Sequence, residues 1–307
     1  MLDLRRLRLL RELEARGTLG AVAAALDYTP SAVSQQLAVL ERETGARLIE
    51  PAGRGVRLTE AGQVLARHAD TLLARVEAAE AELAAASGTV AGTVRVWGFQ
   101  SATLQLAIPA AADLARSAPE VRLEVAEAEL EEALPALRLG AVDVVLGDEY
   151  DGLPRPRPAG LHRETLLRET LRLVLPADHA LATSRRPVAL ERLRDAAWAI
   201  SDPGTGHHEM LVRICRERGG FEPDLRHRST DVIVLLELVR RAGAVTLLPE
   251  LALQDPGSGV AVRSPSGGET HREVFALTRE GAAGRPAVAA VLEALRGASP
   301  SRGTSRA

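Results

Sequence analysis

Apolar residues recur at helical spacing in two short segments near the start of the chain. Those between Leu19 and Leu26 fall at i, i+3, i+4 and i+7, which predicts a short helix with one buried face. After a short break, Thr29 and Pro30 give a start signal for a second helix, because a threonine hydroxyl caps the first turn and proline suits the first helical position. The pattern therefore predicts two helices joined by a tight turn.

The second helix is amphipathic. Its buried face is predicted to hold Val33, Leu37 and Leu40, and its outer face holds Ser31, Ser34 and Gln35. Two short helices with a tight turn can place the second helix in the major groove of DNA, where serine and glutamine hydrogen-bond base edges and phosphates. Most helical pairs are ordinary hairpins, so the neighbouring segments decide between the two interpretations.

The neighbouring segments favour DNA binding. A preceding helix is marked by Leu4, Leu7 and Leu10, and residues 51–58 indicate a turn between two short strands with Arg54 at its tip. A further helix begins after Thr59. Together these segments predict a winged helix-turn-helix over residues 1–59.

Residues 60–88 are predicted to form one long helix, which contains no proline and ends at a glycine. Apolar residues recur along it at steps of three and four. So long a helix cannot bury this row against so small a head, which favours a pairing helix in a dimer. A solvated linker helix is the alternative. The expected dimer contacts are Leu65, Leu72, Val76 and Leu83.

Beyond residue 92 the pattern changes to strands that alternate with helices. The first unit has expected strands at 93–99, 121–126 and 142–146, and expected helices at 102–117 and 130–139. This βαβαβ order predicts a parallel sheet covered by helices. The proline-rich residues 152–160 form a loop. A second unit has expected strands at 171–175, 198–200 and 244–248, and expected helices at 190–194, 208–218 and 231–241. A strand at 273–278, a helix at 286–295 and a disordered tail over 298–307 complete the expected order.

Composition narrows the class of protein. The length of 307 residues and a hydrophobic fraction of 46% indicate a soluble protein with two or three compact units. No apolar run is long enough for a membrane span, and the N-terminus does not have the pattern of a signal peptide. The single cysteine, Cys215, fits a reducing cytoplasm.

Charge by itself gives no signal for nucleic acid. All 38 basic side chains are arginine, the net charge is −3, and residues 1–60 hold nine arginines against eight acidic residues. A basic surface for DNA must therefore come from placement. The arginines that could provide it are Arg5, Arg6, Arg8 and Arg54.

In their order and spacing, the N-terminal residues resemble the LysR-type transcriptional regulators. The matching pieces are Gly17 to Leu19, the alanine-rich helix to Leu26, Thr29 to Leu37, Leu40-Glu41, Gly45 to Leu48 and Val56 to Gly62. The family usually has an aromatic residue at the position of Ile49 and an arginine at that of Pro51. The wing is therefore expected to hold the DNA backbone with one charge fewer.

The resemblance implies a complete architecture: a winged helix-turn-helix, a linker helix and a two-lobed α/β effector region similar to periplasmic binding proteins. Lobe one is expected over residues 93–163 and 267–297, and lobe two over 164–266. The implied partners are double-stranded operator DNA, a small-molecule effector, RNA polymerase and further copies of the chain in a dimer or tetramer, with no cofactor. The implied DNA contacts are Thr29, Pro30, Ser31, Ala32, Ser34, Gln35, Gln36 and Arg54.

An effector in such a fold lies where strands end and helices begin, because free backbone N–H groups point into the cleft there. Three such places are Gln100-Ser101, residues 201–206 and residues 229–231. Simple helix capping explains the same residues equally well. The expected ligand contacts, including those that rest on the resemblance, are Gln100, Ser101, Thr103, Gly147, Asp148, Pro203, Gly204, Thr205 and Thr230. The charge of Asp148 disfavours a second negative charge nearby.

The main alternative is a small-molecule-binding protein or an enzyme of the same two-lobed fold. His207, His208 and Glu209 suggest a metal site, but adjacent helical residues point about 100° apart and no second ligand cluster appears. No nucleophile elbow, phosphate loop or dinucleotide motif is present. A transport binding protein would need a secretory signal and would lack residues 1–90. The pattern therefore favours a cytoplasmic, ligand-responsive regulator.

Overall fold

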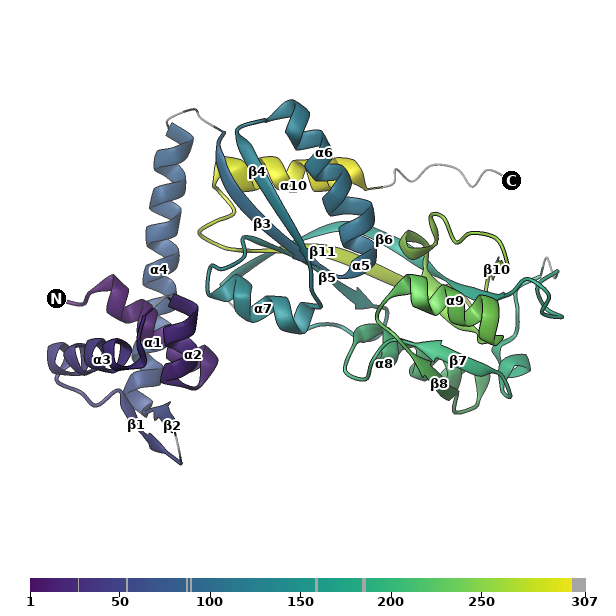
Figure 1. Ribbon diagram of the computed structural model, residues 1–307, viewed down its shortest axis with the longest axis horizontal. Helices are drawn as coiled ribbons and strands as arrows, with labels where there is room; N and C mark the ends of the chain where they lie inside the picture. Colours follow the sequence, from purple (N-terminus) through teal and green to yellow (C-terminus); the bar gives the residue numbers. More distant parts are fainter. Residues whose placement is uncertain are drawn as a thin grey trace.

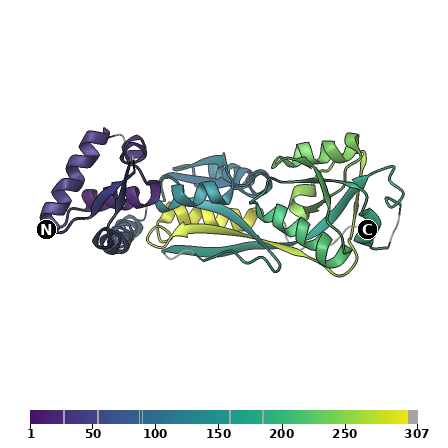
Figure 2. The same cartoon turned by 90° about the horizontal axis from the view of Figure 1, so that it is seen from below.

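The computed structural model describes residues 1–26, 28–53, 55–86, 88, 90–157, 160–183 and 186–299. A small N-terminal head, one long helix and a two-lobed α/β region follow one another along the molecule (Figure 1, Figure 2). Of the helices that the structure describes, none combines the length and apolar character needed to cross a bilayer. The head consists of α1 (Leu4–Arg16), α2 (Leu19–Leu26), α3 (Pro30–Thr44), β1 (Ile49–Ala52) and β2 (Gly55–Leu58).

The head is held together by the apolar faces that the sequence predicts. Val33, Leu37 and Leu40 of α3 are buried against leucines of α1 and against Val22 of α2. Burying side chains of this size stabilises the head by about 1.5–3 kcal/mol each. The predicted order of three helices and a strand pair is confirmed.

Helix α4 (Glu60–Ala86) begins directly after the β1–β2 hairpin. The hydroxyl of Thr59 accepts a hydrogen bond from the backbone N–H of Gly62, at 3.1 Å. A Cβ at Gly62 would lie 2.1 Å from the carbonyl oxygen of Leu48, so only glycine lets the helix start this close to the preceding chain. Ala66 and Ala69 of α4 are buried in the head core, which joins the helix rigidly to the head.

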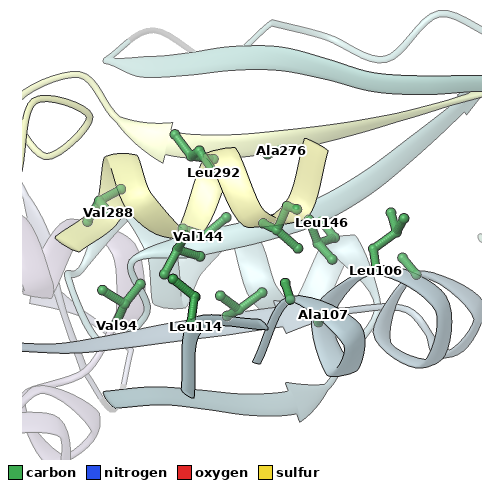
Figure 3. Packing of buried hydrophobic residues seen from close by; sticks show 14 of the residues in the cluster. Val94, Leu106, Ala107, Leu114, Val144, Leu146, Ala276, Val288 and Leu292 are labelled. Carbon is green, nitrogen blue, oxygen red and sulfur yellow. The ribbon is translucent and has the colours of Figure 1, made fainter. Parts of the chain in front are cut away.

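Lobe one is a sheet with helices on both faces. Its strands follow the order β4-β3-β5-β11, with β3 parallel to β4 and β5, so the predicted parallel βαβαβ unit is confirmed. Figure 3 shows α6 and α10 packing on one face of this sheet through Leu114, Val288 and Leu292. Helix α7 covers the opposite face. The elements are β3 (Gly92–Gly98), α5 (Gln100–Ala102), the π-helical η1 (Thr103–Ala107), α6 (Ile108–Ser117), β4 (Val121–Glu127), α7 (Leu130–Arg138), β5 (Val144–Tyr150), β11 (His271–Arg279) and α10 (Pro286–Ala298).

Lobe two packs helices around shorter strands. Its main core surrounds Trp198 and Phe221, and the buried Cys215 lies in it. The elements are the second half of β6 (Leu161–Pro176), η2 (Leu190–Leu193), β7 (Ala197–Ile200), α8 (Gly206–Ile214), the π-helical η3 (Cys215–Gly219), β8 (Asp224–Arg228), α9 (Val232–Ala242), β9 (Thr246–Pro249), η4 (Glu250–Leu253) and β10 (Val260–Arg263).

Strand β6 belongs to both lobes. The family resemblance implies strands that cross between the lobes, but the sequence pattern predicted only residues 171–175 of this strand. Residues up to Thr170 pair with β11, whereas Leu171 and the residues after it pair with β9 and β10. The strand therefore begins ten residues before the predicted strand at 171–175, and the chain passes between the lobes at Thr170 rather than at the expected boundary of 163/164.

Three smaller differences from the predicted order concern single elements. Strands β8 and β10 were not predicted. Helix α10 runs to Ala298, where a disordered tail was expected to begin. The rest of that expected tail, residues 300–307, lies outside the described residues.

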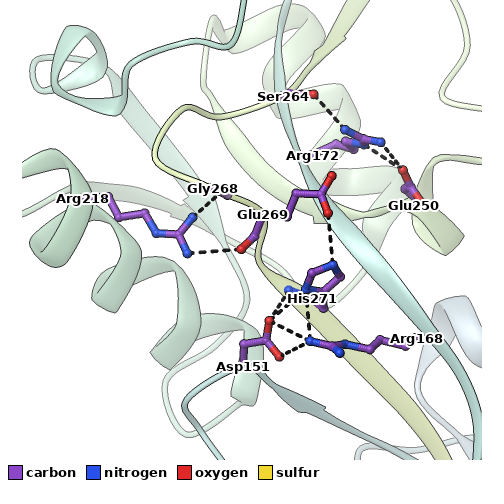
Figure 4. Close-up of polar contacts among 9 residues, drawn as sticks. All are labelled: Asp151, Arg168, Arg172, Arg218, Glu250, Ser264, Gly268, Glu269 and His271. Carbon is purple, nitrogen blue, oxygen red and sulfur yellow. Dashed lines mark hydrogen bonds and ion pairs between the residues drawn. The ribbon is translucent and has the colours of Figure 1, made fainter.

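The two lobes are joined at the crossing of β6 and β11 by polar contacts (Figure 4). Asp151 accepts hydrogen bonds from the backbone N–H of His271 at 3.0 Å and from Arg168 at 3.0 Å. In lobe two, Arg218 donates to the carbonyl oxygen of Gly268 at 2.7 Å. These bonds hold together the strands that connect the two lobes.

Candidate nucleic-acid interface and ligand cleft

Helix α3 presents a polar face to solvent at the edge of the head. The hydroxyl of Thr29 caps the helix by accepting a hydrogen bond from Ala32 N at 3.2 Å, and Pro30 occupies the first helical position. Ser31, Ser34 and Gln35 are exposed, as the sequence predicts. Exposed hydroxyl and amide groups of this kind can bond the bases and phosphates of a groove.

Gln36 lies apart from the other predicted DNA contacts. It is half-buried, and its amide oxygen accepts a hydrogen bond from Arg6 Nε at 3.0 Å. Arg6 also forms an ion pair with Glu43 of α3. Gln36 and Arg6 therefore join α1 to α3, and both are less available to DNA than Ser34 and Gln35.

The predicted wing is a two-stranded antiparallel hairpin, with Ile49 paired to Leu58 and Ala52 to Gly55. The predicted tip residue, Arg54, lies outside the described residues. Arg57 is an exposed cation of β2 and forms an ion pair with Glu50 at 2.7 Å. The hairpin is anchored to α3 because Glu41 accepts a hydrogen bond from the backbone N–H of Leu48 at 2.8 Å.

A cavity lies between the lobes, where α5, α8 and α9 begin. Its free volume is about 50 Å³, which holds a few water molecules. It brings together five of the predicted ligand residues from widely separated parts of the chain. These are Gln100, Ser101, Asp148, Thr205 and Thr230.

Gln100 bridges this cleft by bonding the opposite lobe. Its side-chain nitrogen donates to Asp231 Oδ1 at 2.9 Å, and its side-chain oxygen accepts from the backbone N–H of Val232 at 2.6 Å. A residue of α5 thus satisfies part of the first turn of α9. We call this pair of bonds the Gln100 clasp.

Four predicted ligand residues do not line the cleft. Thr103 is buried, and its hydroxyl donates to the carbonyl oxygen of Gly98 at 2.8 Å within the π-helical segment. Gly147 faces the core instead, because a Cβ there would lie 2.7 Å from the ring of Phe275. Pro203 and Gly204 are exposed in the turn before α8. These four residues were assigned from their position in the chain alone. The pleat of β5 turns Gly147 towards the core, and the turn before α8 leaves Pro203 and Gly204 exposed to solvent.

Arg272 of β11 is the main cleft residue that the sequence analysis missed. Its side chain is 4% exposed and donates to Glu169 at 2.7 Å, to Ser101 at 3.1 Å and to Asp148 at 3.4 Å. Burial opposes the charge, but Glu169 and its other neighbours raise the pKa of Arg272 above its ordinary value. An arginine within a strand is usually solvated, so no local signal could have identified it.

The cleft also contains a buried neutral histidine, His207. Its Nε2 lies 2.7 Å from the carbonyl oxygen of Leu247, and its Nδ1 lies 2.8 Å from the hydroxyl of Ser201. Burial lowers the pKa of His207 to about 4. Both ring nitrogens are engaged, and no group of three or more potential metal ligands occurs among the described residues.

Two carboxyl groups at the cleft are held at raised pKa values. Burial raises the pKa of Asp148, although Arg272 and Arg155 lower it. Burial and the neighbouring Asp148 raise the pKa of Glu129 to about 7. Because Arg272 is already paired with Glu169, the cleft carries an excess of negative charge when both groups are ionised.

Of the four predicted dimer contacts on α4, two are exposed to solvent and two lie against other parts of the same chain. Leu72 and Leu83 are exposed, at 42% and 73%, on a face that nothing in the described chain covers. Leu65 instead packs on the head core, and Val76 is half-buried beside lobe one. The face that remains for a partner is therefore narrower than the sequence suggested.

Comparison with known proteins finds relatives over nearly the whole chain. The family model described as "LysR substrate binding domain" matches residues 87–300, and the model "Bacterial regulatory helix-turn-helix protein, lysR family" matches residues 4–63. The HTH-type transcriptional regulator MetR of Escherichia coli (strain K12) is 26% identical over 298 residues, which cover 96% of this chain and 90% of MetR.

Solved structures share the fold. A cysteine-substituted variant of full-length OxyR from Pseudomonas aeruginosa superposes with a TM-score of 0.71 at 21% identity, covering 96% of this chain and 95% of OxyR. Full-length CbnR complexed with its target DNA gives a TM-score of 0.55 at 19% identity, covering 97% of this chain and 100% of CbnR. The likeness therefore includes the head, α4 and both lobes.

Proposed function

The chain belongs to the LysR family of transcriptional regulators, and from this premise we propose that α3 and the wing bind operator DNA while a small molecule bound in the cleft changes that binding. The family consists of regulators, so no catalytic role forms part of the proposal. RNA polymerase is the expected further partner and the cytoplasm the expected compartment. The proposed units are the head, the linker helix α4 and the two lobes.

The exposed polar face of α3 carries the DNA part of this proposal. Ser34 and Gln35 are exposed on a helix whose opposite face is locked into the head core. A rigid helix with exposed hydroxyl and amide groups can enter the major groove and discriminate bases. The DNA complex of CbnR supports this use of the fold.

The test is affinity for the DNA upstream of the protein's own gene against random DNA of equal length. Ser34→Ala and Gln35→Ala should each lower the discrimination by about 1–3 kcal/mol. Ser117→Ala on α6 and Gln63→Ala on α4 are matched controls, since both residues are exposed outside the head. Unaltered discrimination in both α3 variants would refute this assignment of the recognition helix.

The effector part rests on Ser101 and Thr230, which line the cleft from opposite lobes. Operator affinity is measured with and without a metabolite extract of the cells, for wild type, Ser101→Ala and Thr230→Ala. The extract should change the affinity of wild type more than that of either variant. An equal response in all three proteins would show that the ligand binds elsewhere.

The charges of the cleft restrict the class of effector. Arg272 donates hydrogen bonds to Glu169, Ser101 and Asp148. Burial and the neighbouring Asp148 raise the pKa of Glu129. A further negative charge would meet two carboxyl groups in a buried site. A neutral or positively charged effector therefore fits this cleft best.

A thiol switch does not form part of the proposal. The OxyR chain that shares the fold carries a substituted cysteine, which raises the question of a reactive thiol here. The single cysteine of this chain, Cys215, is buried in lobe two, and burial raises the pKa of its thiol to about 12. A neutral, buried thiol is a poor nucleophile towards oxidants.

The exposed row on α4 supports self-association of the chain into a dimer, and further into a tetramer. Leu72 and Leu83 lie on the helix at a spacing that can pair with a second copy. Leu72→Asp should place a charge in that contact and lower both the mass of the particle and its operator affinity. Ultracentrifugation at micromolar concentration measures the mass, and a monomeric wild type would refute the dimer.

A further inference from the structure

Strand β11 carries two buried arginines that serve different parts of the molecule. Arg272 lies at the ligand cleft, and Arg279, seven residues further along the same strand, contacts the linker helix α4. At about 3.4 Å per residue the two positions are about 24 Å apart. Between them β11 is hydrogen-bonded to β5 on one side and to β6 on the other, so both arginines belong to one strand in the middle of the sheet.

At the far end of β11, Arg279 holds α4 against lobe one. Its Nη2 and Nε lie 2.7 and 2.9 Å from Glu77 Oε1, and its Nη1 donates to the carbonyl oxygens of Leu137 and Val142 at 2.8 and 2.6 Å. The side chain of Arg279 is 10% exposed, and that of Glu77 is 22% exposed. Because the two carbonyl oxygens fix the orientation of the guanidinium, a carboxylate can pair with it in one preferred geometry. The ion pair therefore restricts the position of the Glu77 side chain relative to lobe one.

The turn after β11 adds a second contact with the same helix. A Cβ at Gly281 would lie 2.3 Å from the carbonyl oxygen of Ala74 and 3.2 Å from the backbone nitrogen of Ala78, so the backbone of the turn touches the backbone of α4. At its other end, α4 is continuous with the head, because Ala66 and Ala69 are buried in the head core. The position of Glu77 and Ala74 therefore sets the position of the head.

At the near end, the partners of Arg272 are the residues that a ligand would engage. Ser101 and Asp148 line the cleft and bond Arg272, and Glu169, which also bonds Arg272, belongs to β6. A ligand that bonds Ser101 or Asp148 competes with Arg272 for them. The pairing of β11 with β6 shifts register between Val274 and Phe275, between the two arginines, and such an irregularity is where a strand changes its twist.

We propose that β11 couples the ligand cleft to the DNA-binding head, with Arg279 and Gly281 as positioning residues that transmit a change at Arg272 to α4. This inference rests on the proposed function, since it specifies how the effector cleft would regulate DNA binding. The two arginines are the two ends of one element that both sites contact.

The experiment uses the full-length protein and the duplex DNA upstream of its own gene, and needs no effector. Asp148→Asn stands in for a change in the cleft, because it removes a charged partner of Arg272. Operator affinity is measured for wild type, Asp148→Asn, Glu77→Gln and the double variant. We expect Asp148→Asn to change the operator Kd by about 2- to 30-fold, and the same change to shrink to nearly nothing when Glu77→Gln is present.

Matched controls separate coupling from general damage to α4. Glu80→Gln removes a carboxylate one turn along the same helix, and in that background Asp148→Asn should keep its full effect. Gly281→Ala should abolish the effect as Glu77→Gln does, because its Cβ has no room, whereas Gly284→Ala should not, since a Cβ there would meet only Ala81 at 4.0 Å. Ser101→Ala repeats the test with a milder change in the cleft.

The outcomes distinguish this inference from the proposed function. An effect of Asp148→Asn that persists in full in the Glu77→Gln and Gly281→Ala backgrounds overturns the coupling through β11 while leaving the regulator intact. Operator affinity that neither Asp148→Asn nor Ser101→Ala changes overturns it as well. Failure of the wild-type protein to bind the upstream DNA refutes the proposed function itself.

Discussion

In the head, the polar side chains of α3 are exposed on the surface, and the apolar Val33, Leu37 and Leu40 pack the helix onto the core. In the cleft, by contrast, the charged side chains of Arg272 and Glu169 are themselves buried. A surface group in the head can be exchanged without leaving a buried partner unsatisfied. Substitution of a buried polar residue in the cleft leaves its former partner buried, with no hydrogen bond from water or from another side chain. Polar residues therefore have different consequences for stability in the two regions.

The largest difference is expected from matched arginine substitutions. Arg272→Leu leaves Glu169 buried without its cation and should lower the free energy of unfolding of the effector region by about 3–5 kcal/mol. Arg57→Leu in the wing breaks a solvated pair, 71% exposed at the arginine, and should cost about 0–1 kcal/mol. Chemical denaturation measures both values. Equal losses of unfolding free energy in Arg272→Leu and Arg57→Leu would contradict the proposed difference between the cleft and the head.

The cleft should also respond to acid through His207. Its pKa is about 4 in the folded protein and about 6.5 in the unfolded chain, so the unfolded chain binds the proton first as pH falls. The stability that this group contributes is complete above pH 6.5 and is lost towards pH 4, by about 2–3 kcal/mol. Denaturation at pH 7.5 and 4.5 tests this loss. His207→Gln should flatten the difference, whereas His162→Gln, at an exposed position, should not.

Glu129 should give a pH dependence of stability with the opposite sign to that of His207. Its pKa is raised to about 7 in the folded protein, so the folded state holds the proton longer than the unfolded chain and loses stability as pH rises from 4.5 to 7. Glu129→Gln should therefore stabilise the protein by about 1–2 kcal/mol at pH 8, after allowance for partial exposure, and not at pH 4. Glu132→Gln on the exposed side of α7 is the control. A variant that gains nothing at pH 8 would show that Glu129 is well solvated.

The smallest expected effect concerns the helix cap in the head. Thr29→Ala removes one hydrogen bond to Ala32 N and should destabilise α3 by about 1 kcal/mol. Hydrogen exchange of the α3 amides should accelerate while those of lobe two remain protected. Thr71→Ala, in the middle of α4, is the matched control. Equal acceleration in both regions would mean that the head and the lobes unfold together.

The head could be predicted from sequence because its signals are local. Thr29 and Pro30 start α3, and the spacing of Val33, Leu37 and Leu40 determines which face is buried. The physical reason is that caps and helical periodicity act within a few residues of one another. The bond between Gln36 and Arg6, a residue 30 positions away, had no such local signal, and the contact of Gln36 with DNA stays a prediction.

The cleft could be predicted only in part. Ser101, Thr205 and Thr230 were found because helix starts have local signals, but Arg272 acquires its role from partners on other elements. The first ten residues of β6 were missed for a related reason. They alternate little in polarity, and what makes them a strand is their long-range pairing with β11.

The Gln100 clasp has a consequence for the time course of the response. A ligand too large for the free space of about 50 Å³ that the proposed site has while Gln100 bonds the first turn of α9 would enter only in the fraction of time when these two bonds are broken. The apparent affinity is then reduced by that fraction, and the observed association rate levels off at the rate of parting as ligand concentration rises. The two hydrogen bonds of Gln100 would therefore limit how fast the protein can bind an effector after the effector concentration changes.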